Sequence, residues 1–282
     1  MEVLTIILSG LLSLAASGGI VVDSVVASKI RSQVIGVEEQ KVRIDNSPNY
    51  SVAQGKLQKV RIATRGTRIK PNLRIEALEL ETDPLDLDPA KLNLNGIDEL
   101  RLSLNKPFQG AVRLVLTEED LNQALRSPQV LAQIQKALNR LIVSKAGSTN
   151  IAYQLLDLNL ELRPNNRLGV KLKLVRPVSN FESNSDSQDS RPSSRSRELN
   201  MALELGIQVA EGNKISLIDP EGMVNGRPMS PRLLNGFAVG VGDRLNLGLL
   251  EQDGILARIL QLEIDEDKIE LASFLKLETK NP

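Results

Sequence analysis

The residues best suited to chemistry in this sequence are carboxylates, because the chain has no His and no Cys. Asp86, Asp88 and Asp98 are close enough in sequence to suggest a pair of groups acting as acid and base. Turn prolines at Pro84 and Pro89 accompany them, and Asp beside such prolines usually bonds the local backbone. We therefore interpret the three as turn residues and predict no catalytic residue.

The missing side chains exclude most other reactive sites. Without His and Cys there is no Ser-His-Asp or Cys-His nucleophile and no thiolate or imidazole metal site. Gly240-Val241-Gly242 begins like a dinucleotide loop but lacks the third glycine and follows a helical pattern. Asp265, Glu266 and Asp267 lack the glycine and the terminal Glu of a calcium loop. We expect no cofactor, no metal and no enzyme activity.

Charge is segregated in one part of the chain. Between residues 55 and 74 there are seven basic residues and no acidic one, and between residues 76 and 99 the carboxylates dominate. Neighbouring strands of opposite sign predict cross-strand ion pairs, and the alternative is a site for anionic lipid head groups. The candidate head-group residues are Lys56, Lys59, Arg61, Arg65, Arg68, Lys70 and Arg74.

The whole composition points away from nucleic acid and towards an aliphatic interior. The formal net charge is +0, and four Phe and two Tyr leave few rings for stacking on bases, so no nucleic-acid partner is expected. Leucine alone contributes 47 of the 282 residues. Such a chain can bury a large core that has few rigid aromatic side chains.

The N-terminal segment allows three interpretations. Residues 3–22 are uncharged and long enough to span a bilayer, which suits a cleaved signal or a retained anchor. Glu2, without a Lys or Arg beside it, argues against the signal, and three glycines with four hydroxyl residues weaken the anchor. Beyond them, Val22, Val26 and Ile30 recur at helical spacing, and Gly36 follows as a stop, which predicts an amphipathic helix that is retained and packs on the protein or lies on a membrane.

The rest of the chain alternates between apolar and polar residues with the period of a β-strand. Turn dipeptides such as Asn95-Gly96 and Lys106-Pro107 separate the runs. The predicted strands carry Val42/Ile44, Leu73/Ile75, Leu78/Leu80, Leu100/Leu102/Leu104, Val112/Leu114/Leu116, Leu158/Leu160/Leu162, Leu168/Val170/Leu172/Leu174 and Leu199/Met201/Leu203/Leu205/Ile207/Val209, and a hairpin over 259–277 turns at residues 265–268.

Three helices interrupt these strands. Thr117 caps a helix with acidic residues in its first turn, and Ser127-Pro128 opens a second that continues to about Val143. Ser230-Pro231 opens a third. The Ser-rich stretch over 179–198 predicts a disordered insertion between two strands of one sheet. We expect the strands on both sides of it to share a curved sheet, with the N-terminal helix or the helices of 117–143 on its concave face.

The order of these parts resembles a known family. The segments that carry the likeness are Ala27-Ser28-Lys29-Ile30-Arg31-Ser32-Gln33, Val42-Arg43-Ile44, Gly55-Lys56-Leu57-Gln58-Lys59-Val60-Arg61-Ile62, Leu78-Glu79-Leu80-Glu81-Thr82-Asp83-Pro84 and the stretch from Leu114 to Leu125. Together they resemble the LmeA-like phospholipid-binding family of bacterial envelope proteins. The likeness covers nearly the whole chain apart from the insertion, and no functional residue can be carried over from it.

The resemblance implies an α+β fold in which a curved antiparallel sheet wraps a long helix, similar to the tubular lipid-binding (BPI-like) architecture. It implies phospholipid binding without catalysis in an apolar groove or tunnel, with a role in membrane or cell-envelope maintenance or lipid transfer. The expected partner is a phospholipid or an anionic membrane surface, and the expected location is the membrane, on the envelope or periplasmic side. The alternative is a structural or scaffolding protein whose aliphatic core is full. We expect an N-terminal helix over 1–36 and a single domain over 37–282.

Overall fold

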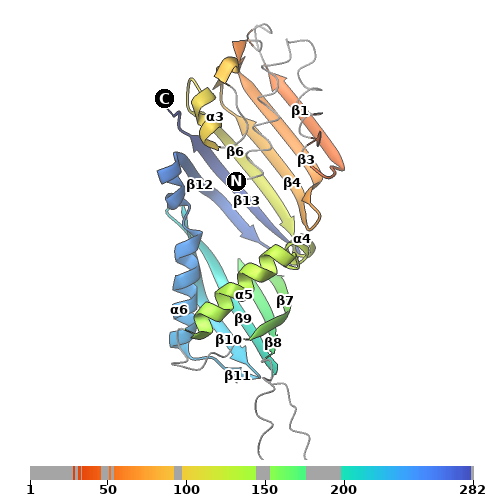
Figure 1. Ribbon diagram of the computed structural model, residues 1–282, viewed down its shortest axis with the longest axis vertical. Helices are drawn as coiled ribbons and strands as arrows, with labels where there is room; N and C mark the ends of the chain where they lie inside the picture. Colours follow the sequence, from red (N-terminus) through yellow and green to blue (C-terminus); the bar gives the residue numbers. More distant parts are fainter. Residues whose placement is uncertain are drawn as a thin grey trace, which may run out of the picture.

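The fold is built mainly from two large antiparallel β-sheets that follow one another along the long axis of the molecule (Figure 1). The computed structural model describes residues 28, 31–32, 34–45, 51, 54–91, 97–143, 153–175 and 198–280. The expected signal, anchor or helix over residues 3–27 and the Ser-rich insertion up to residue 197 therefore lie outside the described residues.

The larger sheet has six strands in the order β1-β3-β4-β6-β13-β12. Its register places apolar residues in rows, since Ile62 pairs with Leu80 and Leu80 pairs with Val112. Successive side chains of a strand point to opposite faces, so one face of this sheet is aliphatic and the other carries the charges. The strands are β1 (Glu39–Asp45), β3 (Lys59–Lys70), β4 (Leu73–Thr82), β6 (Phe108–Thr117), β12 (Ile255–Ile264) and β13 (Lys268–Leu277).

Small elements cover one end of the aliphatic face. A two-stranded sheet of β2 (Lys56–Leu57) and β5 (Leu85–Asp86) lies there with the turn η2 (Pro89–Lys91) and helix α3 (Ile97–Ser103). The main core cluster of buried residues includes Leu57, Leu87, Leu104, Phe108 and Leu277.

The predicted strand at Leu100/Leu102/Leu104 is wrong, because α3 occupies this stretch. Leu102 is 37% exposed, whereas Leu104 is buried in the core cluster. Residues two apart share a face in a strand but not in a helix, so three leucines at this spacing do not establish a strand by themselves.

The smaller sheet has five strands in the order β11-β10-β9-β8-β7. Its apolar face is covered by helices α5 and α6, which Figure 1 shows in front of the strands. Leu158, Leu172 and Leu203 of the sheet form a buried cluster with Leu234 of α6. The strands are β7 (Gln154–Arg163), β8 (Arg167–Val175), β9 (Glu198–Ala210), β10 (Lys214–Val224) and β11 (Arg227–Pro228).

A glycine permits the close approach of α6 to this sheet. A Cβ added at Gly222 would lie 2.8 Å from side-chain atoms of Leu203, Met229 and Leu234. The absence of a side chain at this position therefore lets Leu234 pack directly on β10.

The three predicted helices begin where the sequence places them. In α4 (Glu118–Leu125) the Thr117 side chain accepts a hydrogen bond from the Asp120 backbone N–H, and Asp120 completes the capping box. Helix α5 (Pro128–Val143) follows Ser127, and α6 (Pro231–Gly242) starts after the N-cap Ser230. Two short 3₁₀ turns, η3 (Asp243–Leu245) and η4 (Leu247–Asp253), lead from α6 to β12.

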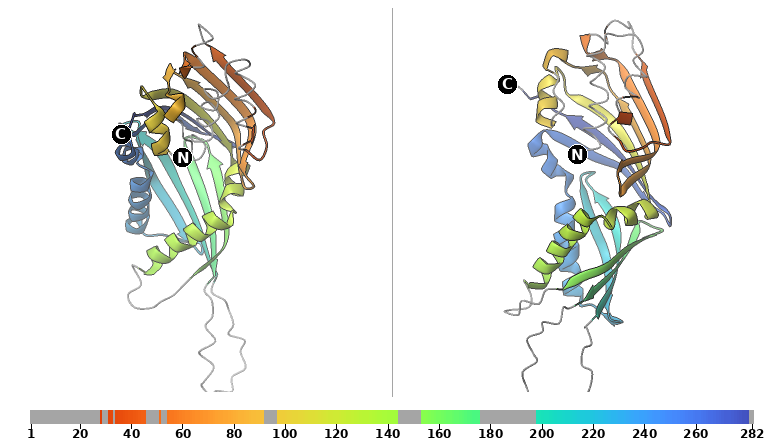
Figure 2. Two further views of the ribbon diagram at one scale, coloured as in Figure 1. Left: turned by 45° about the horizontal axis from the view of Figure 1, so that its top comes forward. Right: turned by 45° about the vertical axis from the view of Figure 1, so that its right-hand side comes forward.

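Strands from both sides of the insertion pair with each other, as predicted. Strand β8 pairs with β9 across it, and β6 pairs with β13. The expected single curved sheet is instead two open sheets (Figure 2). The long helix wrapped by a sheet stays a prediction: α5, with 16 residues, lies beside the smaller sheet.

Candidate functional site

The aliphatic face of the six-stranded sheet is covered unevenly. At the α3 end, Phe108 and Leu277 are fully buried. Farther along the same two strands, the side chains on this face are only half-buried. We call this part the β6–β13 apolar face, and it consists of Val112, Leu114, Leu116, Ile269, Leu271 and Leu275.

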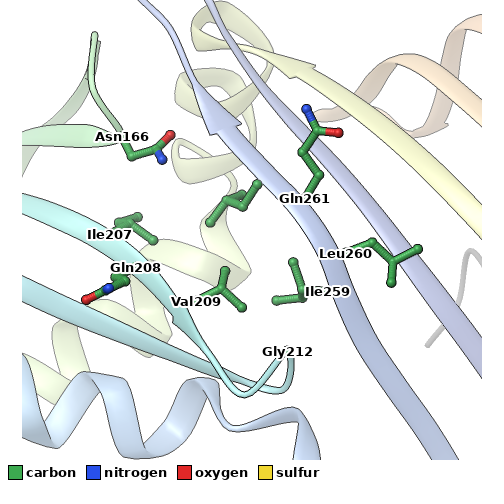
Figure 3. Close-up of a pocket in the computed structure, with 9 residues that line it drawn as sticks. Asn166, Ile207, Gln208, Val209, Gly212, Ile259, Leu260 and Gln261 are labelled. Carbon is green, nitrogen blue, oxygen red and sulfur yellow. The ribbon is translucent and has the colours of Figure 1, made fainter.

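A pocket of about 280 Å³ opens where β12 meets the smaller sheet (Figure 3). Ile207 and Val209 of β9 and Ile259 of β12 contribute apolar side chains, while Leu260 points away from the space between the strands. The complete lining is Asn166, Ile207, Gln208, Val209, Gly212, Ile259, Leu260, Gln261 and Leu262, so none of the described residues that line it is charged.

The pocket connects the apolar faces of the two sheets. Leu262 pairs with Leu271, which belongs to the β6–β13 apolar face. On the other side of the pocket, Ile207 pairs with Leu217 in the smaller sheet. Aliphatic residues of both sheets therefore line the pocket at the junction.

Hydrogen bonds fix this junction on both sides of the pocket. The Asn166 side-chain oxygen accepts a hydrogen bond from the Ile264 N–H at 2.7 Å, and its backbone carbonyl accepts one from the Ile207 N–H at 2.8 Å. The Gly212 carbonyl accepts a hydrogen bond from the Ile259 N–H at 2.5 Å. Asn166 has a φ of 58°, in the left-handed region that Asn tolerates better than most residues.

Side chains of α4 and α5 form hydrogen bonds with the backbone of β7, the edge strand of the smaller sheet. Asn122 of α4 donates to the Leu160 carbonyl and accepts from the Leu160 N–H, both at 2.8 Å. Glu118 accepts from the Leu162 N–H at 2.8 Å. Gln135 of α5 accepts from the Leu155 N–H at 2.7 Å. These side chains replace a neighbouring strand and hold the helices against the smaller sheet.

Sequence reasoning did not identify Asn122, Gln135 or Asn166. Asn122 is 8% exposed, which is unusual for a polar residue on a helix. A polar residue adjoining the apolar stripe Leu121/Ala124/Leu125 is the one signal that could have indicated a bonding role for it.

The opposite face of the six-stranded sheet carries a ladder of ion pairs. Glu81 contacts Lys59 at 2.6 Å and Arg61 at 2.8 Å. Arg113 contacts Glu79 at 3.2 Å and Glu270 at 2.6 Å, which extends the ladder to β13. The hydrogen bonds from Lys59 and Arg61 lower the pKa of Glu81 to about 2. This side of the sheet is therefore held by the cross-strand pairs that the charge pattern predicts.

The seven candidate head-group residues are not gathered at one site. Lys59, Arg61 and Arg65 pair with carboxylates of the ladder. Arg74, near α4, contacts Glu38, Glu76 and Asp120, and these hydrogen bonds raise its pKa. Lys56, Arg68 and Lys70 are exposed at other points of β2 and β3.

The three carboxylates that the sequence suggested as turn residues have separate partners, and Asp98 lies in α3 rather than in a turn. The Asp86 carboxylate accepts a hydrogen bond from Asn105 at 3.0 Å. Asp88 contacts Lys91 at 3.2 Å, and Asp98 contacts Lys280 at 3.1 Å. The backbone N–H of Ala90 lowers the pKa of Asp88, and Lys280 lowers that of Asp98.

Metal and membrane-spanning features were sought in the described part of the chain. Its residues contain no cluster of three or more acidic side chains that could hold a metal ion. Its helices include none that combines the length and apolarity needed to cross a bilayer.

Comparison with known proteins gives the family. A search of curated proteins finds no match. The model of a family described as LmeA-like phospholipid-binding matches residues 16–274. The match includes the five-stranded sheet, the junction pocket and the six-stranded sheet up to residue 274 of β13, and the chain therefore belongs to the LmeA-like phospholipid-binding family.

Proposed function

We propose that this protein binds a phospholipid without chemical reaction, with the acyl chains on the β6–β13 apolar face and in the junction pocket. The observation that carries the proposal is that Leu262, which pairs with Leu271 of the β6–β13 apolar face, lines the same pocket as Ile207 of the smaller sheet. Membership of a phospholipid-binding family supports the choice of ligand.

The size and lining of the site fit this ligand. The pocket, at about 280 Å³, is slightly smaller than ordinary ligand sites, which hold roughly 300–1,000 Å³. A two-chain lipid must therefore extend onto the β6–β13 apolar face. Each methylene that leaves water contributes about 0.8 kcal/mol, so an acyl chain needs no charged partner to bind.

The amides around the pocket provide polarity without charge. Gln208 and Gln261 belong to its lining, and Asn166 lies at its end. Uncharged donors and acceptors can bond the ester or glycerol oxygens of a lipid while the chains occupy the aliphatic surface. We infer a role in membrane or cell-envelope maintenance or lipid transfer, at the envelope or periplasmic side.

Native mass spectrometry of protein purified without detergent tests the proposal. We expect a co-purified phospholipid that is reduced in Leu271→Gln, because this change puts an amide on the β6–β13 apolar face. Leu256→Gln is the matched control, since Leu256 is half-buried and pairs with Lys276, on the charged face. If the protein carries no phospholipid even after incubation with phospholipid vesicles, the proposal is contradicted. This result would favour a scaffold with a filled core.

The basic residues remain a proposed contact for anionic head groups at a membrane surface. The support is the exposure of Lys56, Arg68 and Lys70. Replacing these three with Gln should weaken binding to vesicles that contain acidic phospholipid. Added salt should weaken the binding of the native protein to the same vesicles. Lys59→Gln with Arg61→Gln is the comparison, because both side chains lie in the ion-pair ladder with Glu81. Unchanged binding by both variants would exclude this surface.

A further inference from the structure

The junction pocket lies between the edges of two strands, β9 and β12. Among the described strands, β13 alone pairs with β12, which is the last strand of its sheet. In the smaller sheet, β8 begins at Arg167, which pairs with Gly206, so residues 207–210 of β9 extend beyond β8. Val209 of this extension and Leu262 of β12 both line the pocket.

Asn166 shows how wide the space between these two edges is. Its backbone carbonyl accepts a hydrogen bond from the Ile207 N–H of β9 at 2.8 Å, and its backbone N–H donates to the Ile264 carbonyl of β12 at 3.4 Å. The backbone of one residue therefore fills this end of the space, as a strand between β9 and β12 would. The two edges are about two strand spacings apart, or roughly 10 Å. The pocket continues this position where the chain has turned away towards β7.

Backbone groups of both edges point into the pocket. Alternate residues of a strand direct their N–H and carbonyl groups to the same side. The Ile207 N–H points away from β10, towards Asn166, so the N–H and carbonyl of Val209 also point away from β10. The Ile264 N–H points away from β13, and the register between Ile264 and Leu262 is unbroken, so Leu262 does the same. Val209 and Leu262 therefore present backbone donors and acceptors from opposite sides.

Both ends of this space are closed. Asn166 lies at one end, and at the other the Gly212 carbonyl accepts a hydrogen bond from the Ile259 N–H (Figure 3). Between these contacts β12 comprises residues 260–263, which span roughly 13 Å as a strand. A continuous strand of a partner protein would meet both contacts. A compact polar group, from which chains leave sideways, fits the space better.

The apolar faces of both sheets lie beside these backbone groups. Val209 is on the same face of β9 as the buried Leu203 and Leu205, because residues two apart in a strand share a face. Leu262 pairs with Leu271 of the β6–β13 apolar face. A ligand bonded to the two strand edges can therefore lay its hydrocarbon chains on these faces.

We propose that the junction pocket binds the glycerol ester group of the lipid, with the N–H groups of Val209 and Leu262 donating to its two ester carbonyls. The inference rests on the proposed function and adds which part of the lipid bonds the pocket. An ester carbonyl accepts hydrogen bonds without carrying charge, which suits a pocket whose described lining residues are uncharged. A dialkyl ether lipid lacks these carbonyls, so the site favours ester-linked phospholipids.

Hydrogen exchange at single amides tests this contact in the full-length protein. The protein is loaded from vesicles of diacyl phosphatidylcholine and then separated from them. Exchange at the Val209 and Leu262 amides should slow at least tenfold on loading. The Gln208 and Glu263 amides are the matched controls, because they point to β10 and β13 and should exchange slowly in both states.

The ester preference is measured with dialkyl phosphatidylcholine of the same chain length, which should bind roughly tenfold more weakly because two hydrogen bonds are lost. Leu262→Pro removes one donor at a position where an edge strand tolerates proline, and should reduce this ratio. Leu262→Ala is its matched control, since it shortens the side chain, keeps the N–H and should keep the ratio.

The outcomes separate this inference from the proposed function. If the loaded protein shows no slowing at either amide, or binds both lipids equally, the ester contact is wrong while phospholipid binding stands. Uptake of neither lipid would overturn both. Amides that are protected without lipid, increasingly so at higher protein concentration, would also contradict the ester contact, because a strand of a second copy would then occupy the pocket.

Discussion

The two sheets have similar alternating sequences but differ in what covers their apolar faces. In the five-stranded sheet, α5 and α6 lie over the leucines, and Leu158, Leu172 and Leu203 are buried. In the six-stranded sheet, Leu114 and Leu271 occupy equivalent alternating positions but remain half-buried. The comparison shows that alternation determines which side chains share a face, while the helices between the strands determine whether that face is closed.

The largest expected effect comes from a leucine of the closed face. Leu203→Ala should lower the free energy of unfolding by about 2–5 kcal/mol, because it leaves a cavity beneath α6. Leu114→Ala should cost less stability but reduce lipid binding more. Urea unfolding followed by circular dichroism measures the first effect, and vesicle binding measures the second. Equal losses of stability would mean that both faces are equally covered.

A smaller loss is expected where a helix bonds the edge of the closed sheet. Asn122→Ala should cost about 1–3 kcal/mol, because the Leu160 N–H and carbonyl lose their side-chain partner. Hydrogen exchange at the Leu160 amide should become faster. Asn235→Ala is the matched control, an exposed Asn on α6 that should change stability little. Unchanged exchange at Leu160 would show that Asn122 does not protect the edge.

Two glycines allow the contact between α6 and the sheet to be tested separately from the exposed side of α6. Gly222→Ala should cost about 1 kcal/mol, near the lower end for overpacking, because the atoms it would meet are ends of flexible side chains. Gly236→Ala, on the open side of α6, should instead stabilise by about 0.5–1 kcal/mol. Thermal unfolding of the two variants measures both changes, and shifts of the same sign would refute this account of the α6 contact.

The smallest expected effect concerns the charged face of the six-stranded sheet. Lys59 and Arg61 lower the pKa of Glu81 from 4.5 to about 2. The carboxylate therefore stabilises the folded protein above about pH 4.5, and this contribution is lost as the pH falls towards 2. In Glu81→Gln the melting temperature should decrease less steeply between about pH 4.5 and 2 than in the native protein. Glu266→Gln, at an exposed turn, should leave this pH dependence unchanged. If the melting temperature decreases equally with pH in both variants, other carboxylates are responsible for the acid sensitivity.

Local signals predicted much of the fold. Thr117 and Ser230 act as N-caps, and residues 265–268 form the turn of the last hairpin. Each depends on residues close in sequence, so a single chain is enough to find it. The helix α3 was missed because its leucines are spaced as in a strand, and β10 was missed because Asp219-Pro220 interrupts its pattern.

The candidate site was harder to predict because its parts meet only in the folded chain. The pocket joins Ile207 to Ile259, and the edge of β7 is bonded by Asn122 and Gln135 from two helices. No spacing along the sequence links these residues. The basic segment was visible, but its partners Glu79 and Glu81 became clear only from the register of β3 and β4.

The side-chain bonds along β7 also affect how the protein behaves at high concentration. An uncovered edge strand offers its N–H and carbonyl groups to a strand of another molecule, which is a common route to aggregation. Asn122, Glu118 and Gln135 already bond such groups of β7, so this edge is a poor template for a neighbouring copy. At the far edge of the other sheet, exposed Lys41 and Arg43 on β1 oppose the same pairing by charge. These two edges are thereby poorly suited to strand-to-strand pairing with another copy of the chain.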